Sequence, residues 1–217
     1  MTLPIIGILG SGTVGEVLAN GFLTHGHTVM RGSREPGKLA DWLKGAGAHA
    51  KTGSFQETAS AADILVLAVK GTAAEGLIKG LPEAALHGKI VIDATNPIAA
   101  KPPVNGVLRF FTGPDESLME RLQASAPSAR FVKAFSCTGN ANMVNPVFEG
   151  GKPSMFICGD SAEAKATVRE ILNRFGWDTE DMGAVEAARA IEPLCMLWCI
   201  PGLVHQQWTH AFKLLKR

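Results

Sequence analysis

The chain carries three regularly spaced glycines close to its start. Gly10, Gly12 and Gly15 form the pattern G-x-G-x-x-G directly after the apolar run at residues 5–9. Glycines at this spacing allow a tight turn, a close approach of the backbone to a pyrophosphate and close packing of a helix on the preceding strand. Free N–H groups at the helix start would bind the anion. We therefore expect a dinucleotide to contact Gly10, Ser11, Gly12, Thr13, Val14 and Gly15.

A hydroxyl and two cations follow the expected second strand, as Ser33, Arg34 and Lys38. Enzymes that use NAD place a carboxylate here to hold the ribose 2′-hydroxyl, and that carboxylate would repel a 2′-phosphate. A serine hydroxyl and a guanidinium instead donate charge-assisted hydrogen bonds to a phosphate. We therefore predict NADP rather than NAD. Two alternatives stay open: Lys38 could be a solvated surface lysine, and Arg31 could point away from the pocket.

The segments after two later strands should line the ribose and nicotinamide, because the carboxyl ends of parallel strands face one crevice. Asn96 carries both a donor and an acceptor for a ribose or a carboxamide. Asp93 could bind the ligand or could cap the local turn. The residues expected to bind the cofactor here are Ala68, Val69, Lys70, Thr95, Asn96 and Pro97.

Composition excludes several classes of protein. Tyrosine is absent, which removes every mechanism that needs a phenol as proton donor. The formal net charge of +1 argues against nucleic acid as a partner. The four cysteines form no C-x-x-C pattern, the first apolar run is too short and too rich in glycine for a signal peptide, and no stretch approaches the length of a bilayer span. We therefore expect a cytoplasmic protein with no membrane partner.

Some reactive side chains have simpler roles. No histidine lies near Cys137 in the sequence, so packing is the expected role of this thiol. Cys195 and Cys199 are one helical turn apart among apolar residues, which favours a packing face over a metal site. His205 and His210 are five residues apart and would not share a helix face. We expect no metal site and assign no catalytic residue.

Apolar runs alternate with amphipathic segments, which predicts an α/β fold of the Rossmann-like, doubly wound type with a mostly parallel sheet. We expect a nucleotide-binding domain at residues 1–182 and a small C-terminal helical extension at residues 183–217, with a loop at 97–114. The expected strands are 5–9, 27–31, 48–51, 63–69, 89–93, 130–135, 154–158 and 177–179. The expected helices are 13–25, 36–44, 73–79, 116–124, 161–175, 184–200 and 203–215, the last two separated by Pro201 and Gly202.

The chain resembles the NADP oxidoreductases that depend on coenzyme F420, and the related NADPH-binding domain of the STEAP metalloreductases. The matching motifs are GILGSGTVG, RGSREPGK, IDATNP, VKAF and EPLCMLW. The resemblance implies one Rossmann-like domain that binds NADP(H), with helices that cover the crevice and often pair subunits. It assigns the pyrophosphate loop to Ser11–Val14 and the 2′-phosphate contacts to Ser33, Arg34 and Lys38. The loop at residues 136–140 departs from the family because it lacks the histidine expected in deazaflavin enzymes.

These observations predict a homodimeric, NADPH-dependent oxidoreductase that exchanges a hydride with a small-molecule acceptor, either a deazaflavin (F420) or a flavin. Hydride transfer between two such rings needs orientation and dryness more than an acid or a base. Two alternatives stay open. One is a reductase of a small carbonyl or imine, and the other is a non-catalytic module that senses NADP.

Overall fold

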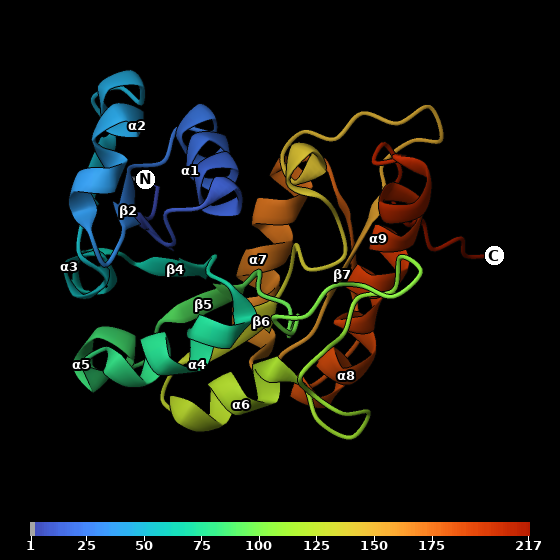
Figure 1. Cartoon of the computed structure of the whole chain (residues 1–217). Helices are drawn as coiled ribbons and strands as arrows, with labels where there is room; N and C mark the ends of the chain where they lie inside the picture. Colours follow the sequence, from blue (N-terminus) through green and yellow to red (C-terminus); the bar gives the residue numbers. More distant parts are fainter. Residues whose placement is uncertain (1–2) are drawn as a thin grey trace.

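A parallel sheet forms the centre of the molecule. The computed structural model describes residues 3–217, so the first two residues of the predicted nucleotide-binding domain lie outside it. The sheet has six strands in the order β3-β2-β1-β4-β5-β6 (Figure 1). This topology confirms the predicted Rossmann-like fold. The strands are β1 Ile6–Leu9, β2 Val29–Gly32, β3 Ala50–Gly53, β4 Ile64–Leu67, β5 Ile90–Asp93 and β6 Arg130–Lys133.

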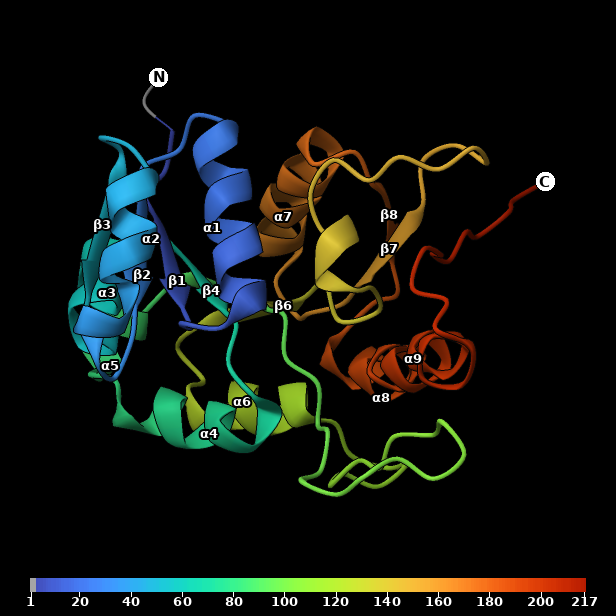
Figure 2. The same cartoon turned by 45° about the horizontal axis from the view of Figure 1, so that its top comes forward.

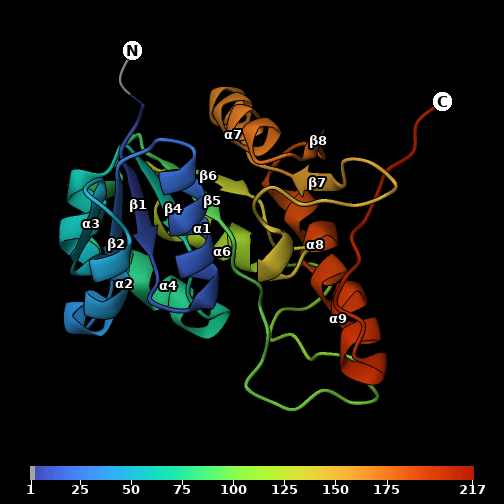
Figure 3. The same ribbon diagram turned by 90° about the horizontal axis from the view of Figure 1, so that it is seen from above.

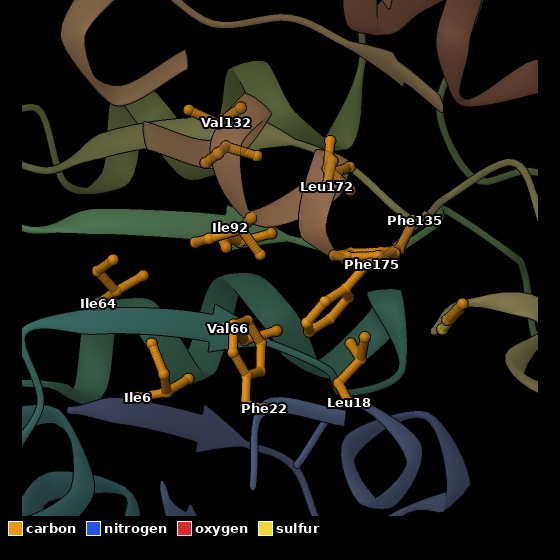
Figure 4. Packing of buried hydrophobic residues seen from close by; sticks show 14 of the residues in the cluster. Ile6, Leu18, Phe22, Ile64, Val66, Ile92, Val132, Phe135, Leu172 and Phe175 are labelled. Carbon is orange, nitrogen blue, oxygen red and sulfur yellow. The ribbon is translucent and has the colours of Figure 1, made fainter. Parts of the chain in front are cut away.

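Helices cover both faces of this sheet, because alternate residues of each strand face opposite sides. Ile64 and Val66 pack on the side of α1 (Thr13–Thr24) and α7 (Ala162–Arg174). Figure 4 shows Val66 beside Phe22 of α1, and Leu172 of α7 belongs to the same cluster. Leu65 and Leu67 pack on the other side. Figure 2 shows α4 and α6 side by side on that opposite face. The helices that contribute to this second cluster are α3 Phe55–Ala61, α4 Gly71–Gly80, α5 Glu83–Leu86, α6 Leu118–Ser125 and α8 Ala188–Ile191.

Several local predictions need correction. The helix expected at residues 36–44 is a 3-10 turn, η1 (Pro36–Leu39), followed by the short helix α2 (Ala40–Gly45). The sequence analysis missed α3, although Ser54 starts it with a complete capping box in which Ser54 and Glu57 bond each other's backbone N–H. It also missed the single turn of α5. The loop expected at residues 97–114 is present.

The last two strands form a sheet of their own. β7 (Ser154–Ile157) and β8 (Asp178–Asp181) pair in parallel with each other. One isolated bridge, between Lys133 and Cys158, joins this two-stranded sheet to β6. The 3-10 turn η2 (Asn140–Asn142) lies between β6 and β7. The strands predicted at 154–158 and 177–179 are therefore present, but they do not join the six-stranded sheet. The predicted cap of α7 is present, since Ser161 Oγ accepts a hydrogen bond from the N–H of Ala164.

The C-terminal helices differ most from the prediction. The chain forms η3 (Val185–Ala187), α8 (Ala188–Ile191) and α9 (Pro193–His205), and α9 continues through Pro201 to a left-handed residue, Gln206, with φ of 58°. The helix expected at 203–215 is absent. Its residues run back over the protein, where the N–H of Ser154 donates to the carbonyl of Phe212. Figure 3 shows this extended end of the chain leaving α9.

One segment is more apolar than the sequence analysis stated. Residues Val185–His205 have a mean hydropathy of 1.4 over their most apolar window and are long enough to cross a bilayer by length and composition. The statement that no stretch approaches this length was therefore wrong. The segment is also attached to the sheet, because Glu192 lies buried against Lys133 of β6. Core helices of soluble proteins pass the same test of length and composition.

Candidate functional site

A cavity of about 770 Å³ opens at the carboxyl ends of β1 to β4. This is the edge at which open α/β sheets bind ligands. Eight of the predicted cofactor-binding residues line it: Ser11, Gly12, Ser33, Arg34, Lys38, Ala68, Val69 and Lys70. The sequence analysis did not anticipate its other lining residues, which are Glu35, Ser54, Phe55, Gln56, Ala73, Gly76, Leu77, Gly80 and Leu81.

The three motif glycines meet different surroundings. A Cβ atom on Gly10 would lie 2.2 Å from the carbonyl oxygen of Ala68, and one on Gly15 would lie 2.5 Å from the carbonyl oxygen of Gly10. Neither position tolerates a side chain, so these glycines hold β1, β4 and α1 close together. A Cβ atom on Gly12 would meet nothing within 4 Å. Gly12 is therefore the glycine that leaves space for a ligand.

The start of α1 suits an anion. Gly12 is the N-cap of this helix and supplies no side-chain acceptor to it. The N–H groups of the first turn, which includes Thr13, Val14 and Gly15, therefore depend on another acceptor. A phosphate beside Gly12 would provide that acceptor and would also interact favourably with the positive end of the helix dipole. The residues present thus fit the pyrophosphate of a dinucleotide.

The predicted 2′-phosphate contacts lie together after β2. Ser33 is buried and accepts a hydrogen bond from the N–H of Glu35, whereas Arg34 and Lys38 are exposed. Lys38 Nζ lies 2.8 Å from Glu35 Oε1. The hydrogen bond and charge of Lys38 hold the pKa of Glu35 below its ordinary value, so this carboxylate is ionised. The sequence analysis missed Glu35, which places a negative charge among the predicted phosphate ligands.

Arg31 does not line the cavity. Its side chain is buried between β2, α1 and α2, with its guanidinium carbon 4.7 Å from the centre of the Trp42 ring. Arg31 thus points away from the pocket, which was one of the two possibilities left by the sequence. Its guanidinium donates to Glu16 and to the carbonyl of Gly12.

Of the contacts predicted on the nicotinamide side, Thr95, Asn96 and Pro97 lie outside the cavity lining. Thr95 is buried and its hydroxyl donates to Asp93 Oδ1 over 2.6 Å. Asn96 Nδ2 donates to the carbonyl of Ser136 over 2.9 Å, which joins the loops after β5 and β6. Asn96 Oδ1 is buried and has no hydrogen-bond partner within residues 3–217. Pro97 follows directly. Thr95, Asn96 and Pro97 do lie at the carboxyl end of a parallel strand, as predicted, but the cavity does not extend to them.

Asp93 belongs to a buried ionic cluster. Lys133 Nζ lies 2.6 Å from Asp93 Oδ2, 2.8 Å from Glu192 Oε1 and 3.0 Å from the carbonyl oxygen of Thr95. Burial disfavours the charged ammonium, but the two carboxylates outweigh it and raise the pKa of Lys133. Glu192 also accepts the N–H groups of Leu118 and Met119 at the start of α6. Asp93 therefore caps the local turn, which is the second of the two roles considered in the sequence analysis. It also pairs with Lys133.

The loop after β6 is uncharged and tightly built. Phe135 is buried with φ of 63°, a left-handed conformation that is costly for a bulky residue. The hydroxyls of Ser136 and Thr138 are buried and lack partners among the described residues. Cys137 is also buried, and desolvation raises its pKa to about 11. This thiol is therefore protonated at neutral pH and unsuited to act as a nucleophile.

The remaining candidates are packed or exposed. Cys195 is buried and Cys199 is half-buried on α9. Residues 3–217 contain no group of three or more histidine, cysteine, aspartate or glutamate side chains that could hold a metal ion. His210 stacks on Trp198, and each of the two side chains bonds the other's backbone carbonyl. His205 is exposed at the end of α9.

Comparison with known proteins bears on this site. Residues 5–97 match the model of the family described as "NADP oxidoreductase coenzyme F420-dependent". The match contains the glycine loop, the segment with Ser33, Arg34 and Lys38, and the strand ends up to Pro97. It confirms the resemblance found in the sequence and, at the level of the family, the prediction of an NADP-dependent oxidoreductase.

Relatives extend the likeness over the whole chain. The chain is 32% identical to Metalloreductase STEAP3 of Rattus norvegicus over 206 residues, which are 93% of this chain and 39% of that protein. A protein of Arthrobacter sp. FB24, provisionally named an F420-dependent NADP reductase, superposes with a TM-score of 0.91 at 28% identity, covering 99% of this chain and 100% of that one. The reductive aminase of Aspergillus terreus, solved with NADPH and ethyl levulinate, has a TM-score of 0.67 at 21% identity, covering 94% and 62%. The last similarity supports the fold alone.

Proposed function

We propose that this protein, which resembles the F420-dependent NADP oxidoreductases, exchanges a hydride between NADP(H) and a deazaflavin or flavin-type acceptor. NADPH supplies the hydride from its nicotinamide ring. The observation that carries the proposal is the contrast between the two halves of the crevice. Charged and hydroxyl side chains surround the cavity after β2, whereas the buried polar groups of the loops after β5 and β6, those of Asn96, Ser136 and Thr138, are uncharged.

The residues divide the work accordingly. The glycine loop and the segment with Ser33, Arg34 and Lys38 would hold the phosphates, and Phe55, Leu77 and Leu81 offer apolar surface for the adenine. The polar atoms of Asn96, Ser136 and Thr138 can orient neutral groups but cannot transfer a proton to a substrate at neutral pH. This set of side chains suits a reaction in which two rings must be held in contact and water excluded. A carbonyl or imine substrate would need a proton donor beside it.

Two measurements test the proposal. Calorimetry should find NADPH bound more tightly than NADH, and Arg34→Ala should weaken NADPH about tenfold or more because one charge-assisted hydrogen bond is lost, with NADH unaffected. Lys44→Met is the matched control, since Lys44 pairs with Asp41 on α2 and does not line the cavity. Stopped-flow mixing with F420, FMN and FAD should then show NADPH oxidation. No oxidation with any of them, or turnover of carbonyls or imines without a flavin, would contradict the acceptor class.

We also propose that two copies of the chain associate through α9. Large apolar side chains are exposed on this helix, among them Leu197 at 55% and Val204 at 47%, and Val107 on the adjacent loop is exposed at 44%. A contiguous apolar surface of this kind supports an interface. Light scattering should give the mass of a dimer for the wild type and of a monomer for Leu197→Glu. A monomeric wild type at micromolar concentration would refute this part.

A further inference from the structure

Arg31 is a charged side chain that the sheet buries completely. It lies on β2 opposite Ile8 of β1, and its exposed fraction is 0%. Ionised groups are seldom buried without partners, because desolvation is costly. Burial accordingly lowers the pKa of Arg31, while the hydrogen bond and charge of Glu16 oppose that shift. An arginine at this position therefore calls for an explanation beyond packing.

The hydrogen bonds of Arg31 lead to the glycine loop and to the first turn of α1. Nη2 lies 3.4 Å from the carbonyl oxygen of Gly12, and Nη1 lies 3.3 Å from Glu16 Oε2 in the first turn of α1. The same carbonyl of Gly12 accepts the N–H of Glu16. Gly12 is the glycine with open space in front of it. Arg31 thus bonds the glycine loop through the carbonyl of Gly12, while Ser11 and Gly12 of the same loop line the cavity.

A second set of contacts reaches the segment that follows the predicted 2′-phosphate ligands. The guanidinium lies over the Trp42 ring, and Trp42 Nε1 donates to Asn20 of α1 over 2.8 Å. Trp42 belongs to α2, which begins directly after Lys38 and η1. Arg31 is therefore packed between the glycine loop and the helix that supports Ser33 to Lys38, yet it does not itself line the cavity.

We propose that Arg31 is a positioning residue that holds the glycine loop through the carbonyl of Gly12, and does not bind the 2′-phosphate. The planar guanidinium can reach Gly12, Glu16 and the Trp42 face together, which a lysine ammonium cannot do. Its loss leaves the loop free to move and costs affinity for any dinucleotide with a pyrophosphate. This inference rests on dinucleotide binding at the loop, as proposed above.

The deciding comparison uses NADH and NADPH with two arginine variants. Arg31→Met should weaken NADH and NADPH, each by about tenfold, a factor that corresponds to roughly 1.4 kcal/mol. Arg34→Ala should weaken NADPH only. If Arg31→Met weakens NADPH and leaves NADH unchanged, Arg31 binds the 2′-phosphate directly and the inference is wrong. If it changes neither affinity, Arg31 is only a packing residue and the inference is again wrong.

A measurement without ligand separates this inference from the proposed function. Arg31→Lys keeps the charge and serves should Arg31→Met fail to fold. In this variant, amide hydrogen exchange of Glu16, whose N–H donates to the carbonyl of Gly12, should accelerate at least about threefold in the free protein, while β4 and β5 keep their protection. Unchanged exchange in this loop would overturn the positioning role. If the wild type binds no dinucleotide but Arg31→Lys still shows this faster exchange, the proposed function is wrong and the role of Arg31 stands.

Discussion

Lys133 and Asp93 form an ion pair in which Nζ and Oδ2 are 2.6 Å apart and neither side chain is exposed. Glu192 shares the same ammonium, so one cation faces two carboxylates in the interior. Removing one member of such a cluster leaves uncompensated buried charge.

The first prediction concerns this cluster. Lys133→Met should lower the free energy of unfolding by about 3–5 kcal/mol, because Asp93 and Glu192 would lose their shared counter-ion. The melting temperature should therefore fall by about 6–20 °C for a chain of this size. Lys213→Met, which breaks a surface pair with Asp178, is the matched control and should melt close to the wild type. A melting temperature of Lys133→Met within about 2 °C of the wild type would show that the cluster adds little stability.

The glycine loop allows a test in which fold and binding separate. Gly12→Ala should keep the melting temperature and weaken NADPH, because its methyl group would enter open space where a phosphate is expected. Gly10→Ala should lower stability by about 1–3 kcal/mol, because its methyl group would collide with the carbonyl of Ala68. Calorimetric unfolding and NADPH titration of both variants check this. Equal NADPH affinity of Gly12→Ala and wild type would show that no ligand approaches there.

Glu35 should limit the affinity for NADPH. Its carboxylate is paired with Lys38, so a 2′-phosphate must compete for that ammonium. Glu35→Gln should tighten NADPH about two- to fivefold, the range of an exposed ion pair, and leave NADH unchanged. Asp41→Asn, which frees Lys44 outside the cavity, is the control. Weaker NADH binding by Glu35→Gln would instead identify Glu35 as a ligand of the ribose 2′-hydroxyl.

Acid should weaken the attachment of α8 to α6. Hydrogen bonds from Arg189, aided by Ser117, lower the pKa of Glu120 from 4.5 to about 2. A depressed carboxylate pKa stabilises the fold at pH values above 4.5, and this stabilisation disappears as pH falls toward 2. Arg189→Met should therefore be slightly less stable than wild type at pH 7, and the difference should be small because solvent screens this exposed arginine.

Urea unfolding at several pH values checks that prediction. The gap between wild type and Arg189→Met should narrow from pH 4.5 to pH 2, whereas Lys44→Met, whose partner Asp41 is almost fully exposed, should match wild type throughout. A gap that stays constant across this range would mean that Arg189 stabilises the protein through its packing alone.

Local patterns predicted the sheet and the glycine loop well. The apolar runs of β1, β4 and β5 are bounded by turn residues, and a buried parallel strand needs little else. The ends of some strands differ from the prediction where a tertiary contact sets them. The strand predicted at 130–135 ends at Lys133, because Phe135 adopts a left-handed conformation and donates its N–H to the sulfur of Met155. Such contacts join residues far apart in sequence and leave no periodic signal.

The C-terminal helices show the other limit. Pro201 and Gly202 predict a break by local rules, yet Trp208 folds back onto Gly202, where a Cβ atom would lie 2.2 Å from the indole ring. Tertiary packing thus keeps the helix through proline and ends it at Gln206. Likewise, Glu35 follows the second strand in the sequence, but only the structure shows that its charge pairs with a predicted phosphate ligand.

The carboxylate of Glu192 completes the first turn of α6 from 74 positions further along the chain. During synthesis from the N-terminus, the strands β1 to β4, whose carboxyl ends border the cavity, emerge long before this glutamate leaves the ribosome. Until then Lys133 has a single counter-ion and the N–H groups of Leu118 and Met119 have none of their final acceptors. The two parts of this sheet edge therefore fold at different times, the part built on β1 to β4 first and the loops after β5 and β6 only after Glu192 has been synthesised.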